Sequence, residues 1–455
     1  MSSYDIVSPY SNEHLHTVTF TSYEQLLQQL STIESGLSTQ QELGIAKRTK
    51  ILKNLHAILQ DNLDVFASLI TTEMGKPISE SYQEMNRALI TLESTIVDSQ
   101  AIRGEAIDGS IYGLNNNKIG VVNYFPLGTI LCITPFNFPI NLALHKLAPG
   151  FAAGNCLLFK PAPQTYLSAK KLVDCCYEAG IPQNCLQLIM PDISDLQRLA
   201  SLSEIHCISL TGSVNAAKSL SKHMGLKKFL CELGGNDPLI VMPDANLELA
   251  AKTAVSQRFG TAGQRCNAPK QFYIHHKVYE NFKRLVIHYT NSLNIGDPSL
   301  DNTDMGPLCS TEAAMKLKEQ VTDAISEGAI SILDIKQDGA LLYPIILESV
   351  PKSSSLLTDE IFGPVMILQS FESIEAVVNS VNRSSFGLQA GIFTQDVNVA
   401  KQLYQKLQVG AVNFNDGPGF RADHFPFSGV KDSGIGSEGT RYTIESMSHR
   451  KVFVI

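Results

Sequence analysis

The stretch Gly128–Pro161, GTILCITPFNFPINLALHKLAPGFAAGNCLLFKP, decides the fold. Two short runs of β-forming apolar residues, TILCI and NCLLF, enclose a segment with the apolar spacing of a helix. Strand, loop and helix at this spacing are typical of a doubly wound parallel sheet in an α/β protein. Ligands of such sheets bind beyond the carboxyl ends of the strands, so residues that follow each strand are the first candidates for a site.

The same alternation continues downstream. CISLTG is followed by a helical segment, and a second α/β region begins near Leu233 with LIVMPDANLELAAKTAV. Upstream, residues 22–113 are predicted to be mostly helical, and GLNNNKIGVVNYFPLG predicts an exposed hairpin with an Asn-rich turn. The chain ends in RKVFVI, a β-rich tail that we expect to join a sheet edge of this chain or of another subunit.

The composition is that of an ordinary globular protein of two or three domains, with 455 residues, 44% hydrophobic, and a formal net charge of −8. The acidic balance argues against nucleic acid or an anionic membrane as a partner. No apolar run approaches the roughly 18 residues of a membrane span, and the first residues lack a signal-peptide pattern. The nine cysteines lack C-x-x-C spacing, which indicates reduced thiols in the cytoplasm and no metal site.

One cysteine has unusual neighbours. The loop FGTAGQRCNAP places Cys266 among small and polar residues, directly after Arg265. A thiolate is a strong nucleophile, and a neighbouring cation lowers the pKa of a thiol. The alternative is a packed, unreactive cysteine, which is the usual state of a free thiol.

Two polar residues stand where strand-like runs end. Glu232 meets Gly234 and Gly235, where a carboxyl group partly removed from water can serve as a general base. Asn137 lies between two prolines, where its amide can donate to a developing oxyanion. Each residue also has a plainer interpretation as a cap of the segment that follows.

Two further signals point to a nucleotide. Gly212 and Ser213 follow a strand and open a helix, whose N-terminal amides can hold a pyrophosphate. This is not the G-x-G-x-x-G pattern and is weak alone. Lys160 ends another strand-like run and is placed for ribose or phosphate oxygens.

Taken together, seven ordered motifs resemble those of the aldehyde dehydrogenase superfamily over nearly the whole chain. They are PFNFP, FKPAPQT, LTGS, ELGGNDP, GQRC, DEIFGPV and FPFSGVKDSGIGSEG. The resemblance implies that Cys266 attacks an aldehyde, that Asn137 and the Cys266 amide hold the oxyanion, and that Glu232 activates water to hydrolyse the thioester. The implied cofactor-binding residues are Lys160, Gly212, Ser213, Glu360, Phe362, Pro135 and Phe136.

The family also implies a domain plan. Residues 1–231 are expected to form a Rossmann-like cofactor-binding domain that carries an oligomerisation hairpin at residues 104–126. Residues 232–425 are expected to form the α/β catalytic domain. Residues 426–455 are expected to return to the cofactor domain and to supply a C-terminal oligomerisation strand. A homodimer or homotetramer follows if such edges pair across subunits.

The cofactor is expected to be NADP or NAD. Many NAD-preferring relatives carry a glutamate three residues after the lysine that corresponds to Lys160, and Pro163 stands there in this chain. Without that carboxylate nothing at this position repels a 2′-phosphate, which favours NADP. The alternative is that Pro163 only loosens the binding of NAD.

Three arginines bear on the substrate, namely Arg265, Arg87 and Arg421. The planar guanidinium suits carboxylates and phosphates because it gives paired, charge-assisted hydrogen bonds. Each arginine also has a plainer interpretation. An arginine at the position of Arg265 occurs in many relatives with neutral substrates, and Arg87 is equally compatible with a structural ion pair. The combination of the three arginines resembles the pattern in the branch of the family that acts on small polar or anionic aldehydes.

That branch includes lactaldehyde, phosphonoacetaldehyde and non-phosphorylating glyceraldehyde-3-phosphate dehydrogenases. Phe138 departs from phosphonate-oxidising relatives, which have histidine there, so glyceraldehyde 3-phosphate or lactaldehyde is the expected substrate. Two alternatives are a CoA-acylating semialdehyde dehydrogenase and a non-catalytic binding protein on the same fold. The presence of Glu232, Cys266 and Asn137 argues against both.

Overall fold

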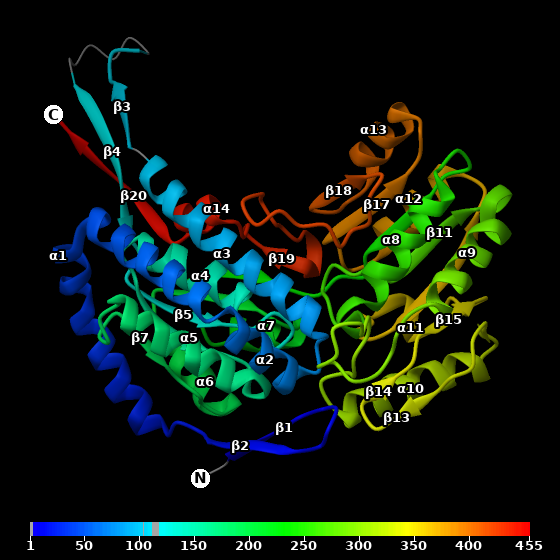
Figure 1. Cartoon of the computed structure of the whole chain (residues 1–455). Helices are drawn as coiled ribbons and strands as arrows, with labels where there is room; N and C mark the ends of the chain where they lie inside the picture. Colours follow the sequence, from blue (N-terminus) through cyan, green and yellow to red (C-terminus); the bar gives the residue numbers. More distant parts are fainter. Residues whose placement is uncertain (1–2, 103, 112–117) are drawn as a thin grey trace.

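The computed structural model describes residues 3–102, 104–111 and 118–455. Within them the chain is organised around two large sheets that lie side by side, and a small three-stranded sheet projects from one of them (Figure 1). Both large sheets are mainly parallel and are covered by helices, so the predicted α/β, doubly wound class is confirmed.

The first large sheet has six strands in the order β19-β9-β8-β5-β6-β7. Their bounds are β5 Thr129–Ile133, β6 Cys156–Lys160, β7 Leu186–Leu188, β8 Cys207–Thr211, β9 Lys228–Glu232 and β19 Gly434–Ile435. Strands β5 to β9 are parallel, whereas β19 returns from near the end of the chain and pairs antiparallel with β9. The direction of winding reverses between β5 and β8, which is the crevice where ligands of doubly wound sheets bind.

Helices cover this sheet on both faces. They are α1 Tyr23–Asp61, α2 Leu63–Met74, α3 Ile78–Ala101, α4 Asn141–Ala152, α5 Tyr166–Ala179, α6 Ile193–Ser201, α7 Val214–Ser221 and α14 Thr440–Ser446. Every residue of α4 is buried, including His145 and Lys146. A charged residue inside a buried helix requires a partner, and that requirement shapes the site described below.

The second large sheet has seven strands in the order β12-β15-β16-β11-β10-β17-β18. Their bounds are β10 Pro238–Val241, β11 Gln271–His275, β12 Ile330–Ser331, β15 Ile345–Glu348, β16 Val365–Phe371, β17 Gln389–Phe393 and β18 Ala411–Phe414. The packed helices are α8 Leu247–Phe259, α9 Tyr279–Asn291, α10 Thr311–Ser326, α11 Ser355–Thr358, α12 Ile374–Arg383 and α13 Val397–Lys406. All pairs are parallel except the edge pair β12–β15.

The projecting sheet combines β3 Glu105–Asp108, β4 Ile119–Pro126 and β20 Ser448–Val454. The C-terminal strand β20 pairs along its whole length with β4 of the same chain, so the tail joins its own hairpin. Part of the predicted Asn-rich turn lies outside the described residues. The helical region ends at Ala101, earlier than predicted. At Gly104 the chain passes so close to the carbonyl of Val122 that a side chain would collide with it.

Two minor strand pairs complete the architecture. They are β1 Ser3–Val7 with β2 His14–Thr19, and β13 Gln337–Asp338 with β14 Leu341–Leu342. The sequence analysis missed the first pair because both strands are rich in polar residues. Its inner face is made by Ile6 and Val18, which pack with Met190. No helix in the described ranges is long and apolar enough to cross a membrane.

Candidate active site

The predicted residues gather at the carboxyl ends of four neighbouring strands. Asn137 follows β5, Lys160 ends β6, Gly212 follows β8 and Glu232 ends β9. Because these strands are parallel, all four residues lie along one edge of the six-stranded sheet. The loop that carries Cys266 approaches from the second sheet, and the Asn137 side-chain amide donates to the carbonyl of Gln264 at 2.8 Å.

A strained turn presents Cys266. A short 3-10 helix, Gly260–Gly263, follows α8. Within it, Thr261 and Ala262 adopt the left-handed conformation, with φ angles of 52° and 51°. Such conformations cost free energy in residues other than glycine and persist only where the surroundings impose them. Here the buried side chain of Arg258 donates to the carbonyl oxygens of Gly263 and Pro269, on either side of the cysteine.

The Cys266 thiol is half-buried, whereas seven of the nine cysteines are fully buried. Burial raises the pKa of Cys266 to about 12, and the neighbouring cations Lys270 and Arg421 oppose that shift. Lys270 is itself fully buried and its ammonium donates to the carbonyl oxygens of Arg265 and Cys266. The resting chain therefore holds a protonated thiol near fixed positive charge.

Asn137 has the geometry of an oxyanion donor. It does not cap α4, because the cap position is Ile140 and makes no side-chain hydrogen bond. One amide hydrogen is used by the carbonyl of Gln264, which leaves the other free. The backbone N–H of Cys266 has no acceptor among the described residues. The Asn137 side chain and the Cys266 backbone thus keep one unused N–H each, and a developing oxyanion needs donors of this kind.

Glu232 is buried and its Oε2 has no hydrogen-bond partner in the described structure. It does not cap the following helix α8, because Asn246 does so. Burial raises the pKa of Glu232 well above its usual range, and the nearby Glu438 carboxylate adds to that shift. Arg421 and Lys146 act in the opposite direction. A carboxyl group whose pKa is raised in this way is a stronger base when it is ionised.

Glu438 and Lys146 are functional candidates that the sequence analysis did not single out. The Lys146 ammonium donates to Glu438 Oε2 at 3.0 Å, and Arg421 donates to Glu438 Oε1 at 2.7 Å. A small cavity lined by Lys146, Glu232 and Glu438 lies between them. Glu438 stands within the quoted motif FPFSGVKDSGIGSEG, so that motif carried the only available signal.

The crevice between β5 and β8 suits a dinucleotide. A side chain at Gly212 would meet only Leu210, at the ordinary distance of 3.4 Å, so nothing in the chain itself requires glycine there. Close approach of a ligand to the backbone is a sufficient reason. Ser213 is the N-cap of α7 and accepts from the amide of Ala216, so its hydroxyl is already engaged.

Lys160 is a cation without a counter-charge. It is half-buried at the end of β6, and among the described residues its ammonium makes no ion pair or hydrogen bond. Burial alone lowers the pKa of Lys160 to about 8. A bound anionic group, such as a phosphate, would restore the favourable surroundings that the ammonium lacks.

The remaining cofactor candidates come from both sheets: Pro135 and Phe136 follow β5, and Glu360 and Phe362 precede β16. Phe362 and Phe136 pack edge to face with their ring centroids 5.9 Å apart. Pro135 directly precedes Phe136 in the chain. Glu360 accepts from the amide of Gly235 at 3.3 Å, and burial raises the pKa of its carboxyl group. The motifs PFNFP and ELGGNDP are thus brought into contact with DEIFGPV.

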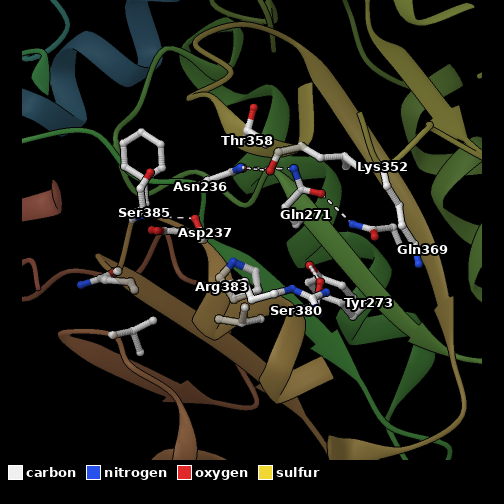
Figure 2. A pocket seen from close by; sticks show the side chains of 18 residues that line it. Asn236, Asp237, Gln271, Tyr273, Lys352, Thr358, Gln369, Ser380, Arg383 and Ser385 are labelled. Carbon is white, nitrogen blue, oxygen red and sulfur yellow. Dashed lines mark hydrogen bonds between the residues drawn. The ribbon is translucent and has the colours of Figure 1, made fainter. Parts of the chain in front are cut away.

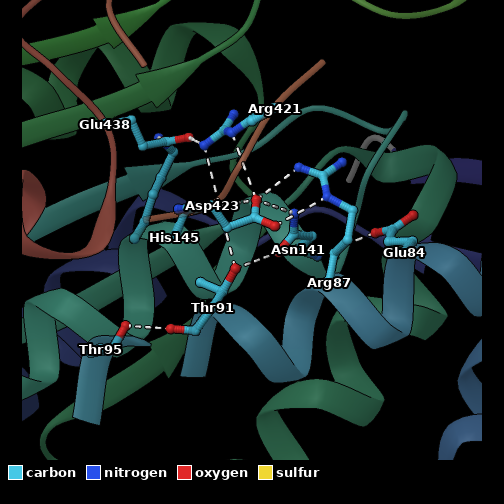
Figure 3. Close-up of polar contacts among 10 residues, drawn as sticks. Glu84, Arg87, Thr91, Thr95, Asn141, His145, Arg421, Asp423 and Glu438 are labelled. Atoms are coloured by element: carbon cyan, nitrogen blue, oxygen red, sulfur yellow. Dashed lines mark hydrogen bonds and ion pairs between the residues drawn. The ribbon is translucent and has the colours of Figure 1, made fainter. Parts of the chain in front are cut away.

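The predicted substrate arginines form two groups, and Figure 3 shows the first, which contains Arg87 and Arg421. Arg87 makes a paired hydrogen bond to Asp423, at 2.7 and 3.1 Å. Arg421 lies 3.7 Å from the same carboxylate and is deeper, bonded to Glu438. Burial opposes ionisation of Asp423, but hydrogen bonds from His145 and Arg87 prevail and hold the pKa of Asp423 well below its usual range.

Arg265 belongs to the second group, around Phe138. Its guanidinium lies 5.6 Å from the Phe138 ring centroid, that of Arg87 lies 5.9 Å away, and the Lys76 ammonium lies over the same ring at 3.8 Å. Arg265 is also 3.6 Å from Glu80. Phe138 immediately follows Asn137, so the two arginines stand beside the proposed oxyanion site.

The chain is similar to known proteins along nearly its whole length. The model of the aldehyde dehydrogenase family matches residues 1–453. Sulfoacetaldehyde dehydrogenase of Neptuniibacter caesariensis is 46% identical over 453 residues, covering 100% of this chain and 99% of that protein. Lactaldehyde dehydrogenase of Methanococcus maripaludis is 34% identical over 99% of this chain and 97% of its own length.

The fold is also similar to that of solved structures. The crystal structure of NADP-dependent glyceraldehyde-3-phosphate dehydrogenase from Bacillus halodurans, complexed with NADP, superposes with a TM-score of 0.97 at 30% identity. The superposition covers 100% of this chain and 96% of that one.

Proposed function

Because the chain belongs to the aldehyde dehydrogenase family, we propose that it oxidises a small anionic aldehyde, with sulfoacetaldehyde as the preferred substrate and NADP as the preferred cofactor. That it is an NAD(P)-dependent aldehyde dehydrogenase follows from the family match and from the dehydrogenases among its relatives. The substrate and the preference for NADP are the proposal. Glyceraldehyde 3-phosphate and lactaldehyde are the two competing substrates.

One observation carries the substrate proposal, namely that Arg87 and Arg265 flank Phe138 next to Asn137. Each guanidinium keeps unused N–H groups: the Nη1 of Arg87 makes no hydrogen bond in the described structure, and Arg265 is bonded only to Thr261. Each arginine already shares a carboxylate, Asp423 or Glu80, which reduces the net positive charge. This arrangement suits a singly charged sulfonate better than a doubly charged phosphate.

The proposed reaction begins at Cys266. The thiol gives its proton to solvent water as the sulfur bonds to the aldehyde carbon, and the carbonyl oxygen becomes an oxyanion. The free N–H of Asn137 and the backbone N–H of Cys266 are the donors for that oxyanion. When bound, NAD(P) supplies a hydride acceptor, which leaves the acyl group on Cys266 as a thioester.

Glu232 then assists hydrolysis. Its ionised form is a strong base because burial and Glu438 raise its pKa, while Lys146 and Arg421 favour the ionised form. It takes a proton from water as the water oxygen bonds to the acyl carbon. The carbon–sulfur bond then breaks, and the leaving Cys266 sulfur takes up the proton held by Glu232. The products are the carboxylic acid and free Cys266. The same base makes acyl transfer to CoA the less favoured outcome.

The residues that would hold NADP are Lys160 and the start of α7. Lys160 lacks a counter-charge among the described residues, and Pro163 replaces the carboxylate that would repel a 2′-phosphate. Introducing that carboxylate as Pro163→Glu should lower kcat/KM for NADP by about 10-fold or more relative to NAD.

The first experiment compares initial rates with sulfoacetaldehyde, glyceraldehyde 3-phosphate and lactaldehyde, each with NADP and NAD, without CoA. We expect the highest kcat/KM for sulfoacetaldehyde with NADP. Arg265→Gln should then reduce kcat/KM for sulfoacetaldehyde by about 10- to 100-fold and leave lactaldehyde within about 3-fold. An equal loss with both aldehydes would remove the anion-binding role, and a requirement for CoA would favour the acylating alternative.

A further inference from the structure

A second cavity lies in the catalytic half of the chain, away from Cys266. It occupies about 550 Å³ between the starts of β10 and β11, the face of β16, the end of α12 and the segments 352–358 and 384–387 (Figure 2). This volume is in the range of small-molecule sites. None of the catalytic, cofactor-binding or substrate-binding candidates described above lines it.

The wall of the cavity is a chain of side-chain amides. Gln369 donates to Gln271 at 2.6 Å, Gln271 donates to Asn236 at 3.1 Å, and Asn236 donates to the carbonyl of Leu357 at 3.0 Å. Gln271 and Asn236 are more than nine-tenths buried. Fixed, buried amides facing an open volume form a polar surface that is already organised for a ligand.

Two unpaired cations stand at the same cavity. Lys352 and Arg383 are exposed, and within the described part of the chain neither makes an ion pair or a side-chain hydrogen bond. The only carboxyl group in the lining is that of Asp237, which is 1% exposed and whose Oδ2 has no partner among the described residues. Burial raises the pKa of Asp237 to about 8, so this group is largely uncharged at neutral pH. The cavity is therefore net positive.

Asp237, which lines the cavity, is linked through Lys270 to the backbone of Cys266. The carbonyl of Asp237 accepts from the amide of Lys270 at 2.9 Å, and the Lys270 ammonium donates to the carbonyl of Cys266. A Cβ built on Gly235 would lie 2.6 Å from Asp237 Oδ1 and 2.8 Å from the Cys266 carbonyl. Gly235 thus lies between the Asp237 carboxyl group and the backbone carbonyl of Cys266, with no room for a side chain.

We propose that this cavity is a second ligand site for a small organic anion, whose charged group pairs with Lys352 and Arg383 and whose polar body lies against the amides of Gln271, Gln369 and Asn236. Its occupancy alters the reactivity of Cys266 through Asp237 and Lys270. The proposal does not depend on which aldehyde is oxidised.

Inorganic phosphate is the probe for the charged subsite. At a phosphate concentration tenfold above Kd, the full-length chain should gain about 1 to 2 °C in Tm over sodium chloride of equal ionic strength. The double variant Lys352→Ala/Arg383→Ala should lose that gain, and both side chains are exposed, so its fold should be intact. Lys406→Ala, an exposed lysine paired with Glu375 on α12, is the matched control and should retain it.

An equal gain in wild type and double variant would place phosphate elsewhere, at Lys160 or the substrate arginines, and would overturn the proposal, as would no gain at all. The coupling is tested by the rate at which iodoacetamide alkylates Cys266. Phosphate should change that rate at least about 2-fold in wild type and not in the double variant. Binding without any change in this rate would remove the link to Cys266.

Discussion

At the scale of single residues, Cys266 is one of two half-buried cysteines and is set apart from the other, Cys309, by the neighbouring cations Lys270 and Arg421. Burial raises the pKa of the Cys266 thiol to about 12 and that of Cys309, the other half-buried cysteine, to about 11. The proton therefore has to leave during attack. The resting thiol is protected from indiscriminate oxidation, because only the thiolate is reactive.

This pKa gives a pH-dependence that can be measured. Below a pKa of about 12 the thiolate fraction rises tenfold per pH unit, so the rate of Cys266 alkylation by iodoacetamide should rise about tenfold per unit between pH 7 and 9. Mass spectrometry of the modified peptide follows it. Cys266→Ala should reduce aldehyde oxidation at least about 10³-fold, while Cys309→Ala stays within about 2-fold. A rate that levels off below pH 8 would contradict the raised pKa.

Lys160 gives a second pH-dependence, of opposite sign. Burial lowers the pKa of its ammonium to about 8, so the free chain carries the charge below pH 8 and loses it above. The preference for NADP over NAD, taken as the ratio of their kcat/KM values, should therefore fall as the pH rises from 7 to 9. Lys160→Arg keeps its charge over this range and should give a flat ratio. A flat ratio in the wild type would mean that Lys160 does not contact the 2′-phosphate.

At the scale of elements, the start of α4 is held by a buried ion pair from another part of the chain. Lys76, in the turn between α2 and α3, bonds to Glu84 at 2.5 Å, and both side chains are fully buried. The other oxygen of Glu84 accepts from the amides of Ile140 and Asn141, at 2.9 and 3.2 Å. Since only Phe138 and Pro139 separate Asn137 from these amides, the pair helps to fix the segment that carries the proposed oxyanion donor Asn137.

Breaking this pair should affect both stability and rate. Lys76→Met or Glu84→Gln leaves a buried charge without its partner and should lower the free energy of unfolding by about 3 to 5 kcal/mol. The double variant removes both charges and should recover a large part of that loss, while its kcat stays reduced because Asn137 is less well held. Denaturant unfolding and initial rates measure the two effects.

The control for these variants is the exposed pair Lys170–Asp174 on α5. Lys170→Met should change the free energy of unfolding by less than about 1 kcal/mol. Additive losses in the Lys76 and Glu84 double variant would show that the two side chains do not act as a pair.

The residues at strand ends could be predicted from the sequence, whereas the ion-pair partners could not. Asn137, Lys160, Gly212 and Glu232 follow runs of β-forming residues, and parallel strands bring such positions to one edge without further information. The partners of the arginines are another matter. Asp423 meets Arg87 across 336 positions of the chain, and only tertiary packing decides such a pairing.

Three other features were missed or left open by the sequence. Lys76 and Lys146 look like ordinary lysines in sequence, and only the burial of α4 and of the turn after α2 shows that each must have a carboxylate partner. The first strand pair, β1–β2, lacks strong alternation. The position of β20 on its own hairpin was one of two possibilities that the sequence left open.

At the scale of the whole molecule, the three-stranded sheet of β3, β4 and β20 stands away from the two large sheets (Figure 1). Its apolar side chains are largely open to solvent: Phe453 is 66% exposed, and Val452, Val454 and Ile455 are each more than half exposed. Exposed apolar clusters of this kind mark contact surfaces, and the outer edges of β3 and β20 offer unpaired backbone groups. The predicted homo-oligomer is expected to form here.

This expectation can be tested without disturbing the chemistry. Phe453→Glu places a charge in the exposed apolar cluster, so it should shift the chain to a smaller species in size-exclusion chromatography with light scattering. Leu226→Glu changes an even more exposed apolar residue in the turn before β9 and should leave the size unchanged. Because Phe453 lies on the projecting sheet, far along the chain from the strand ends of the site, alkylation of Cys266 should proceed at the wild-type rate in both variants. If Phe453→Glu keeps the wild-type size, the subunits must associate through another surface, and the open cluster on β20 then needs a different partner.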